Sequence, residues 1–309
     1  MLAAGLSVRK PEEDTVRIVL AGSSGFIGGH LSRALEAAGH TVTTLVRRPG
    51  RAATEVAWDP DAGVLPSAAL DGADVVINLC GAGVGDRRWT ARRLELLRSS
   101  RVDPTRLLAS GCARHGVLAL LNASAVGYYG DRGDELLRES ARAGASTLAR
   151  LCVDWEAATL PASDAGTRVV LLRTGLVLGP DGGMLPLLAL LTRMFAGGRL
   201  GSGRQYWPWI SVADHVAAVM FLCAADVRGP VNLTAPNPVR NAEFTRELGH
   251  VLRRPTPWAV PGFALHAALG GFAQEILGGQ RAVPAALLAA GFSFLQPNLA
   301  TALRAWTVR

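Results

Sequence analysis

The first half of the chain alternates short, β-branched apolar runs with longer segments in which apolar residues recur at helical spacing. Residues 16–21 predict a buried strand, and residues 26–38 predict a helix that ends at Gly39. Further strands are expected at 41–46, 55–58, 73–79, 117–123 and 168–174, and further helices at 90–115, broken or bent near Pro104, and at 146–165. Strands that alternate with helices predict an α/β fold, a Rossmann-type doubly wound parallel sheet with helices on both faces.

The pattern changes after Gly175, where Gly, Pro and Trp become frequent. Helices are expected within 182–198, at 211–225 and at 242–252, and a short strand at 229–235. We interpret this half as a smaller, mixed lobe over the carboxyl edge of the sheet. The expected division is a disordered leader at 1–14, a Rossmann domain at 15–175 to which 206–228 returns, and a substrate lobe and C-terminal module formed by 176–205 and 229–309.

Composition narrows the class of protein. A hydrophobic fraction of 49% in 309 residues is enough for a full core, so disorder is not expected. The net charge is +7, but the arginines that carry it are scattered and no basic and aromatic stripe appears, so no nucleic-acid partner is expected. Attraction for an anionic cofactor is the simpler explanation of the charge.

The sequence lacks the signals that are typical of secreted, metal-binding and membrane proteins. Cys80, Cys112, Cys152 and Cys223 lie far apart in apolar context, which predicts buried thiols in a reducing cytoplasm. The six histidines show no metal-ligand spacing, so no metal site is expected. The N-terminus lacks a signal-peptide layout, and the apolar run 185–191 is too short to span a bilayer. We expect a cytoplasmic protein without a membrane partner, either a monomer or a homodimer.

A glycine-rich segment joins the first strand to the first helix. It reads Gly22-Ser23-Ser24-Gly25-Phe26-Ile27-Gly28, a GxxGxxG spacing that favours dinucleotide binding in this strand–loop–helix context. Gly22 would allow the tight turn, Gly25 the approach of a pyrophosphate, and Gly28 close packing of helix on strand. Free N–H groups at the start of the helix favour phosphates. The alternative is a merely structural turn.

The end of the second strand bears on which dinucleotide is bound. An acidic residue there would hold the ribose 2′-hydroxyl of NAD, but the chain has Arg47 and Arg48 instead. Guanidinium groups grip a 2′-phosphate with paired, charge-assisted hydrogen bonds. The sequence therefore predicts NADP (NADPH) rather than NAD, the alternative being a solvated basic loop.

Two later strand ends add candidate cofactor contacts. Trp58 and Asp59 end the third strand, where an adenine ring would lie and Asp59 would hold its amino group; packing of Trp58 is the alternative. Leu79, Cys80 and Gly81 follow the fourth strand, and the glycine would let the backbone pass close to the cofactor ribose.

These segments resemble the extended short-chain dehydrogenases/reductases, the group that contains sugar-nucleotide epimerases. Further motifs are similar to one atypical branch, the epimerase family of YfcH-like proteins. They are Val76-Ile77-Asn78-Leu79, Arg88-Trp89-Thr90, Ser100-Arg101-Val102, residues 124–130, Asp154-Trp155-Glu156, residues 172–175, Trp209-Ile210, residues 279–284 and residues 290–294. The resemblance covers residues 16–306 and implies a Rossmann fold, NADP binding and a C-terminal substrate lobe, but no particular reaction.

Typical members of that superfamily use a serine and a Tyr–Lys pair spaced YxxxK, in which tyrosine is the acid/base and lysine holds the nicotinamide ribose. This chain has no such pair, because its sole lysine is Lys10, before the first strand. Alignment on the 154–156 motif puts Leu148 at the tyrosine position and Cys152 at the lysine position. General acid/base catalysis contributes about 10²–10⁴-fold in rate, so either another group has taken this role or the chemistry is reduced or absent.

Hydroxyl groups at the fifth strand end are the candidates to replace the pair. Ser124 lies where the family's serine would be, facing cofactor or substrate, and Tyr128 or Tyr129 is a candidate proton donor, with packing as the alternative. In Arg173-Thr174-Gly175, at the crossing from sheet to lobe, the last two residues would approach the nicotinamide.

The candidates for substrate binding come from three separate segments. Arg88 and Arg101 would bind an anionic substrate, with surface or ion-pair roles as the alternative. Arg204 and Trp209, with Trp207, would form a pocket wall, with packing of the lobe as the alternative.

The sequence thus supports two hypotheses. One is an NADP-dependent oxidoreductase or epimerase-like enzyme that acts on a small polar substrate. The other is a non-catalytic NADP(H)-binding sensor or regulatory protein, which the missing Tyr–Lys pair motivates.

Overall fold

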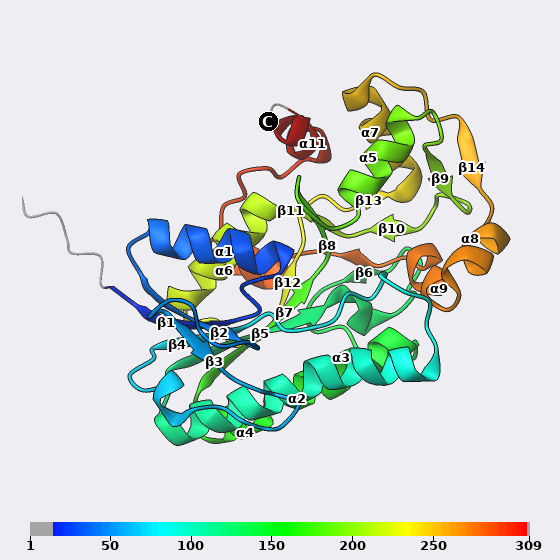
Figure 1. Cartoon of the computed structure of the whole chain (residues 1–309). Coiled ribbons are helices and arrows are strands. Elements are labelled where there is room, and N and C mark those ends of the chain that lie inside the picture. Colours follow the sequence, from blue (N-terminus) through cyan, green and yellow to red (C-terminus); the bar gives the residue numbers. More distant parts are fainter. Residues whose placement is uncertain (1–14, 308–309) are drawn as a thin grey trace, which may run out of the picture.

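The computed structural model describes residues 15–307, so the leader expected at 1–14 lies outside the described residues. At its centre is a seven-stranded parallel sheet in the order β12-β7-β5-β4-β1-β2-β3 (Figure 1). Its strands are β1 (Arg17–Ala21), β2 (Thr41–Val46), β3 (Glu55–Ala57), β4 (Val75–Asn78), β5 (Ala119–Ala125), β7 (Arg168–Thr174) and β12 (Gly229–Leu233). The strand order reverses at β1 and β4, which confirms the doubly wound Rossmann-type fold and places a crevice at that carboxyl edge.

Helices cover both faces of the sheet. Helices α1 (Phe26–Ala37) and α6 (Val212–Ala224) lie on one face, and α2 (Ala91–His115), α3 (Thr147–Ala157) and α4 (Leu160–Asp164) lie on the other (Figure 1). Alternate residues of β1 enter different cores, because Ile18 packs in the core beneath α1, whereas Val19 joins Leu108 of α2. This burial on both faces explains why the strands read as continuous apolar runs.

Pro104 does not interrupt α2. The helix runs from Ala91 to His115 with Pro104 buried inside it, so the break considered for this position is wrong. Burial of α2 against α3, α4 and the sheet offsets the local cost of a proline in a helix interior. Thr90 caps the helix by accepting a hydrogen bond from the Arg93 amide.

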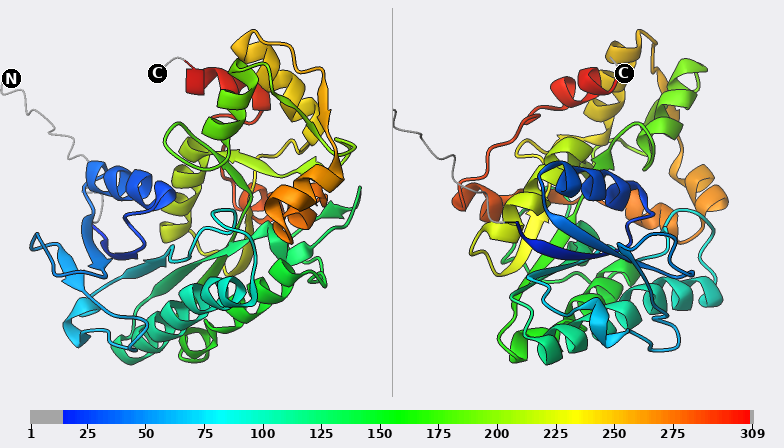
Figure 2. Two further views of the ribbon diagram at one scale, coloured as in Figure 1. Left: turned by 45° about the vertical axis from the view of Figure 1, so that its right-hand side comes forward. Right: turned by 60° about the vertical axis from the view of Figure 1, so that its left-hand side comes forward.

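The second half forms a smaller lobe with a core of its own. Helices α5 (Leu185–Arg193), α7 (Asn241–Leu252) and α11 (Leu299–Thr307) belong to this lobe (Figure 2). Trp207, Trp209 and Phe244 pack in its core with residues of these helices. The lobe also contains α8 (Gly262–Leu269), α9 (Phe272–Leu277) and the short strands β8 (Leu176–Leu178), β9 (Gly198–Leu200), β10 (Tyr206–Trp207), β11 (Trp209–Ser211), β13 (Val239–Arg240) and β14 (Trp258–Val260). Helix α10 (Ala285–Ala289) packs instead on β12, with Leu287 in the core of the sheet. The short strand β15 (Arg281–Ala282) pairs with β6 (Leu136–Leu137), and the 3-10 turns η1 (Ser67–Ala69) and η2 (Val126–Tyr129) lie elsewhere in the chain. No helix among residues 15–307 is both long and apolar enough to cross a membrane.

One boundary of the expected division is wrong. Residues 229–233 form β12, the edge strand beside β7, and so belong to the Rossmann sheet rather than to the lobe. Helix α6, within the segment expected to return to this domain, packs on α1 and β5. Asp214 on α6 then ties the two halves together, since its carboxylate accepts hydrogen bonds from the Leu295 and Gln296 amides at 2.6 and 3.0 Å.

Candidate functional site: the carboxyl edge of the sheet

The glycine loop 22–28 has the backbone that a phosphate site requires. Gly22 has φ +88°, a left-handed conformation that favours glycine. A Cβ at Gly28 would collide with the Gly22 carbonyl oxygen, so α1 packs tightly on its strand. Gly25 is different, because its φ is −78° and a Cβ there would meet nothing closer than 3.5 Å. Neither conformation nor packing within the protein requires a glycine at that position.

The start of α1 is open to a ligand. Its N-cap, Gly25, offers no side-chain hydrogen bond, and the first turn holds no acidic residue. The first amides of a helix have no partner within the helix, so those of Phe26 and Ile27 point their N–H groups outward. Ser23 and Ser24 complete the loop with exposed or half-buried side chains. These features fit the anionic diphosphate of a dinucleotide.

The two arginines after β2 are not equivalent. Arg48 donates to both carboxylate oxygens of Glu55 on β3, at 2.8 and 2.6 Å, and this bond holds the pKa of Glu55 at about 2. Arg47 is exposed, and its charge reaches the Cys80 thiol at the end of β4. Both guanidiniums were expected to be free for a 2′-phosphate. In the part of the chain that the structure describes, Arg47 has no partner, whereas Arg48 is already paired with Glu55.

The residues after β3 mainly serve the protein itself. Trp58 is buried in the core under β2 and β4, which is the packing role considered as its alternative. The Oδ1 atom of Asp59 accepts hydrogen bonds from the Asp61 and Ala62 amides, both at 3.1 Å. It thus caps its own turn, a local role that the sequence reading did not anticipate.

The loop after β4 is fixed from α2. Leu79 and Cys80 are half-buried, and burial raises the pKa of the Cys80 thiol to about 12. A Cβ at Gly81 would lie 3.1 Å from the Arg101 guanidinium carbon. The absence of a side chain at Gly81 therefore leaves space for Arg101. From the sequence, this space was expected to be taken by the cofactor ribose.

At the end of β5 the side chains form a buried network. The Ser124 hydroxyl donates to Oε1 of Glu156 at 2.6 Å, and Arg173 binds both oxygens of Glu156 at 2.8 Å. Burial alone would lower the pKa of Arg173, but the Glu156 carboxylate outweighs it and raises that pKa above its usual value. The network places Ser124 at the expected strand end, but its hydroxyl is already committed to Glu156.

The two tyrosines that follow β5 have different environments. Tyr129 is fully buried, its hydroxyl donates to Asn232 at 2.7 Å and accepts from Arg173 at 3.1 Å, and burial raises its pKa. A proton-donor role for Tyr129 is therefore wrong, because its hydroxyl is enclosed and fully bonded. Tyr128 is half-buried with its ring 3.5 Å from the guanidinium carbon of Arg173, and it remains a candidate.

The position aligned with the family's lysine is Cys152, which lies on α3 and is buried. Burial, with the Glu156 charge, raises the pKa of this thiol to about 12. Leu148, at the tyrosine position, packs near Gly127. The network's acid, Glu156, lies one turn further along the same helix. Glu156 belongs to the 154–156 motif, but no role was expected for it from the sequence. The signal that could have found it is an acidic residue on the buried face of a helix.

Thr174 and Gly175 end β7 at the crossing to the lobe. Thr174 is half-buried, and its hydroxyl lies 3.1 Å from Nε2 of His215, a fully buried histidine that the sequence reading missed. A Cβ at Gly175 would collide with the Pro208 carbonyl oxygen, so the passage of the chain beside β11 already requires this glycine.

The four substrate candidates do not converge. Trp209 is fully buried in the lobe core, so its expected role as a pocket wall is wrong; a large aromatic ring contributes much of the buried area of such a core. Arg204 is exposed, and its carbonyl oxygen binds the Arg240 side chain. Arg88 is exposed near Gly270, where the loop after β4 meets the α8–α9 turn. Arg101 is buried beside Cys152.

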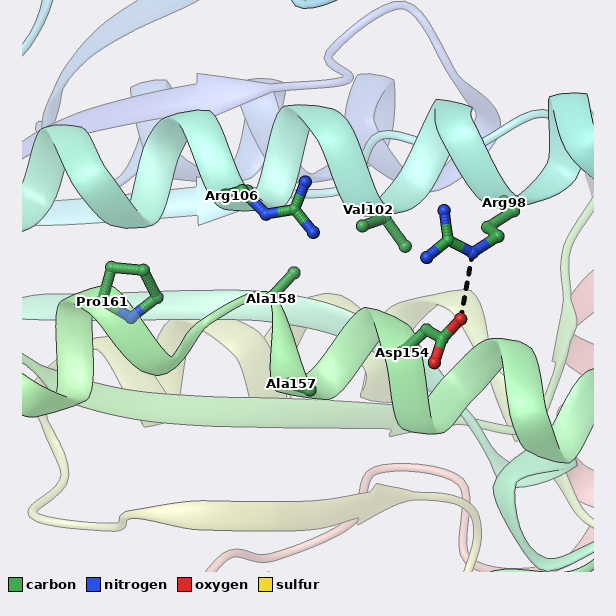
Figure 3. A pocket seen from close by; sticks show the side chains of 7 residues that line it. All are labelled: Arg98, Val102, Arg106, Asp154, Ala157, Ala158 and Pro161. Carbon is green, nitrogen blue, oxygen red and sulfur yellow. Dashed lines mark hydrogen bonds and ion pairs between the residues drawn. The ribbon is translucent and has the colours of Figure 1, made fainter.

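Two surface cavities lie away from this edge. One, of about 200 Å³, runs between α2 and the α3–α4 pair, and its wall carries the Arg98–Asp154 ion pair of 3.0 Å (Figure 3). The other, of about 450 Å³, is lined by residues at the amino ends of the strands, among them Val16, Val75 and Ala119. Neither holds a predicted site residue. Within residues 15–307, no cluster of three or more His, Cys, Asp or Glu side chains could hold a metal ion.

The fold and this edge together define a Rossmann-type protein with a dinucleotide-binding loop. Residues 18–234 match the model of the NAD dependent epimerase/dehydratase family, and residues 260–306 match a domain of unknown function, DUF1731. The chain belongs to this epimerase/dehydratase family. It is 49% identical to the epimerase family protein Mb2239 of Mycobacterium bovis over 94% of this chain and 98% of that protein.

Two solved structures support this assignment. The human epimerase family protein SDR39U1, solved with NADPH, is 31% identical, with a TM-score of 0.88 over 95% of this chain and 99% of that one. A nucleoside-diphosphate sugar epimerase from Corynebacterium glutamicum is 37% identical, with a TM-score of 0.78 over 94% of this chain and 58% of that one. The family resemblance found in the sequence is confirmed.

Proposed function

We propose that this protein binds NADPH along the carboxyl edge of its sheet and uses it as an oxidoreductase or epimerase-like enzyme on a small polar substrate. The observation that carries the binding is Gly25, a glycine that the protein's own conformation and packing do not require, at the uncapped start of α1. The relative solved with NADPH supports the choice of cofactor.

Different residues of this edge would contact different parts of NADPH. The amides at the start of α1 would hold the diphosphate, and Arg47 would face the 2′-phosphate. Ser124 and Thr174, at the ends of β5 and β7, would border the nicotinamide end. When bound, the dinucleotide supplies hydride transfer. Tyr128 is the one expected catalytic hydroxyl group that the buried network does not use, so we assign it the donation of a proton to a substrate oxygen.

A specific observation also favours a second function, that of a non-catalytic NADPH-binding protein. Ser124 and Tyr129, two of the three expected catalytic hydroxyls, are bound to Glu156, Asn232 and Arg173 and buried. Such a protein would bind NADPH tightly without turnover and change its affinity for a partner.

The test is NADPH binding, followed by NADPH oxidation across a panel of small aldehydes and ketones. Binding with turnover that falls at least tenfold in Tyr128→Phe supports the enzyme. Binding without turnover on any carbonyl supports the second function. Failure of the wild-type protein to bind NADPH would sink both.

A further inference from the structure

Arg101 carries a buried charge that no acidic residue between positions 15 and 307 balances. The residue is 9% exposed, its Nη1 donates to the Leu97 carbonyl oxygen at 3.1 Å, and its Nη2 donates to the Ala82 carbonyl oxygen at 2.9 Å. Its Nε makes no hydrogen bond, and no carboxylate among residues 15–307 lies within 4.0 Å of the guanidinium. Burying an unpaired cation costs roughly several kcal/mol, because the cation loses its hydration. An anionic ligand would offset this cost.

The neighbouring groups do not supply the missing negative charge. Glu156 is bound by Arg173 and Ser124, and Asp86 lies beside Arg93 at 3.6 Å. Cys152 faces Arg101 from α3, but burial keeps this thiol neutral by raising its pKa to about 12. The same burial lowers the pKa of Arg101 only to about 10, so the guanidinium stays charged at neutral pH.

The position of this charge indicates which part of a ligand it would meet. Arg101 packs against Gly81 after β4 and lies 5.1 Å over the Trp155 ring. In a doubly wound sheet a dinucleotide crosses the switch point, here between β1 and β4. The adenosine half then lies toward β2 and Arg47, and the distal half lies toward β4, β5 and Arg101.

We infer that Arg101, reaching from α2, binds the distal ribose–phosphate half of the dinucleotide, at the place where α3 presents the Cys152 thiol. This inference rests on the proposed binding of NADPH. It assigns a cofactor role to a residue that the sequence reading gave to the substrate. The competing explanation is that Arg101 acts as a clamp, a residue that only holds the loop after β4 against α2. Ser100 accepts a hydrogen bond from the Ala82 amide, and Arg101 donates to the carbonyl oxygen of the same residue.

Two ligands separate a cofactor contact from a clamp: NADPH, and 2′,5′-ADP, which lacks the distal half. The variant Arg101→Gln removes the charge but keeps a donor for the Ala82 carbonyl oxygen. We expect its dissociation constant to rise about ten- to a hundredfold for NADPH, the loss of charge-assisted hydrogen bonds, and to stay within about twofold for 2′,5′-ADP. Arg98→Gln, on the exposed side of the same helix, is the matched control and should change neither.

A rescue variant places a positive charge on α3 in place of the one removed from α2. Cys152→Lys in the Arg101→Gln background should recover at least a third of the lost NADPH affinity on a logarithmic scale. Equal weakening of both ligands, or no weakening of either, overturns the inference in favour of a clamp. If the wild-type protein binds neither ligand, the proposed function fails instead. Should Arg101→Gln not fold, Arg101→Lys must keep the preference for NADPH over 2′,5′-ADP, and loss of that preference overturns the inference.

Discussion

The Ser124 hydroxyl and the Glu156 carboxylate are joined by a hydrogen bond of 2.6 Å between the end of β5 and the last turn of α3. Glu156 also neutralises Arg173, whose side chain is 4% exposed. The strand end that carries a reactive serine in related folds is therefore tied here into a structural ion pair.

Removing the charge of Glu156 should destabilise the protein strongly. In Glu156→Gln the Arg173 guanidinium stays buried without its carboxylate, and breaking such a pair typically costs about 3–5 kcal/mol. The free energy of unfolding, from urea or thermal denaturation, measures this loss.

The control lies two residues earlier on the same helix. Asp154 pairs with Arg98 at 3.0 Å, but the two side chains are 48% and 46% exposed. Asp154→Asn should therefore cost less than about 1 kcal/mol, as solvent-screened pairs do. Equal losses in the two variants would contradict the role given to burial.

The sheet and the glycine loop could be predicted from the sequence because each depends on local signals. Short apolar runs predicted a strand at each of the seven strands of the sheet, and Gly22 stands where the backbone takes a positive φ. The seventh strand, β12, was placed in the wrong domain. Its five residues pair with β7 only after a long excursion through the lobe, and no local pattern reports that pairing.

The buried network could not be predicted for a related reason. Glu156 and Arg173 are 17 residues apart, and Tyr129 and Asn232 are 103 apart, so their partnership is visible only in the fold. Polar residues such as Ser124 and Tyr129 look the same in a sequence whether they face a ligand or a buried partner. Exposure decides between these roles, and exposure follows from tertiary packing.

Adjacent glycines on α1 should respond in opposite ways to alanine. In Gly28→Ala the new Cβ would collide with the Gly22 backbone, so α1 must move away from its strand, at a cost of about 1–3 kcal/mol or more. In Gly29→Ala the Cβ would lie 3.7 Å from the Ser23 carbonyl oxygen, an ordinary contact. A helical Gly→Ala change without strain stabilises by about 0.5–1 kcal/mol. Melting curves should therefore shift down for the first variant and up for the second.

Arg47 should set the preference for NADPH over NADH. Arg47→Ala removes the exposed guanidinium and should weaken NADPH binding about ten- to a hundredfold while leaving NADH within about threefold. Arg48→Ala should have a smaller effect, because Arg48 is already bound by Glu55.

Glu55→Gln supplies the complementary test of the same pair. It releases Arg48 toward a 2′-phosphate, so affinity for NADPH should hold or rise. Fluorescence titration with both nucleotides measures all three variants, and an unchanged ratio of NADPH to NADH affinity in Arg47→Ala would rule out this assignment.

The buried His215 should make stability fall in mild acid. Burial lowers the pKa of this histidine to about 4 from 6.5, so the folded state resists a proton that the unfolded chain accepts. Above pH 6.5 neither state binds the proton and His215 contributes nothing to the pH dependence. Between pH 6.5 and 4 the unfolded state binds more protons, and the free energy of unfolding should drop by up to about 1.4 kcal/mol per pH unit. Urea denaturation of wild type and His215→Asn across this range isolates the effect, because the variant should lack that part of the slope. His266→Asn, at an exposed histidine, is the control, and a wild-type slope in His215→Asn would show that other groups carry the acid sensitivity.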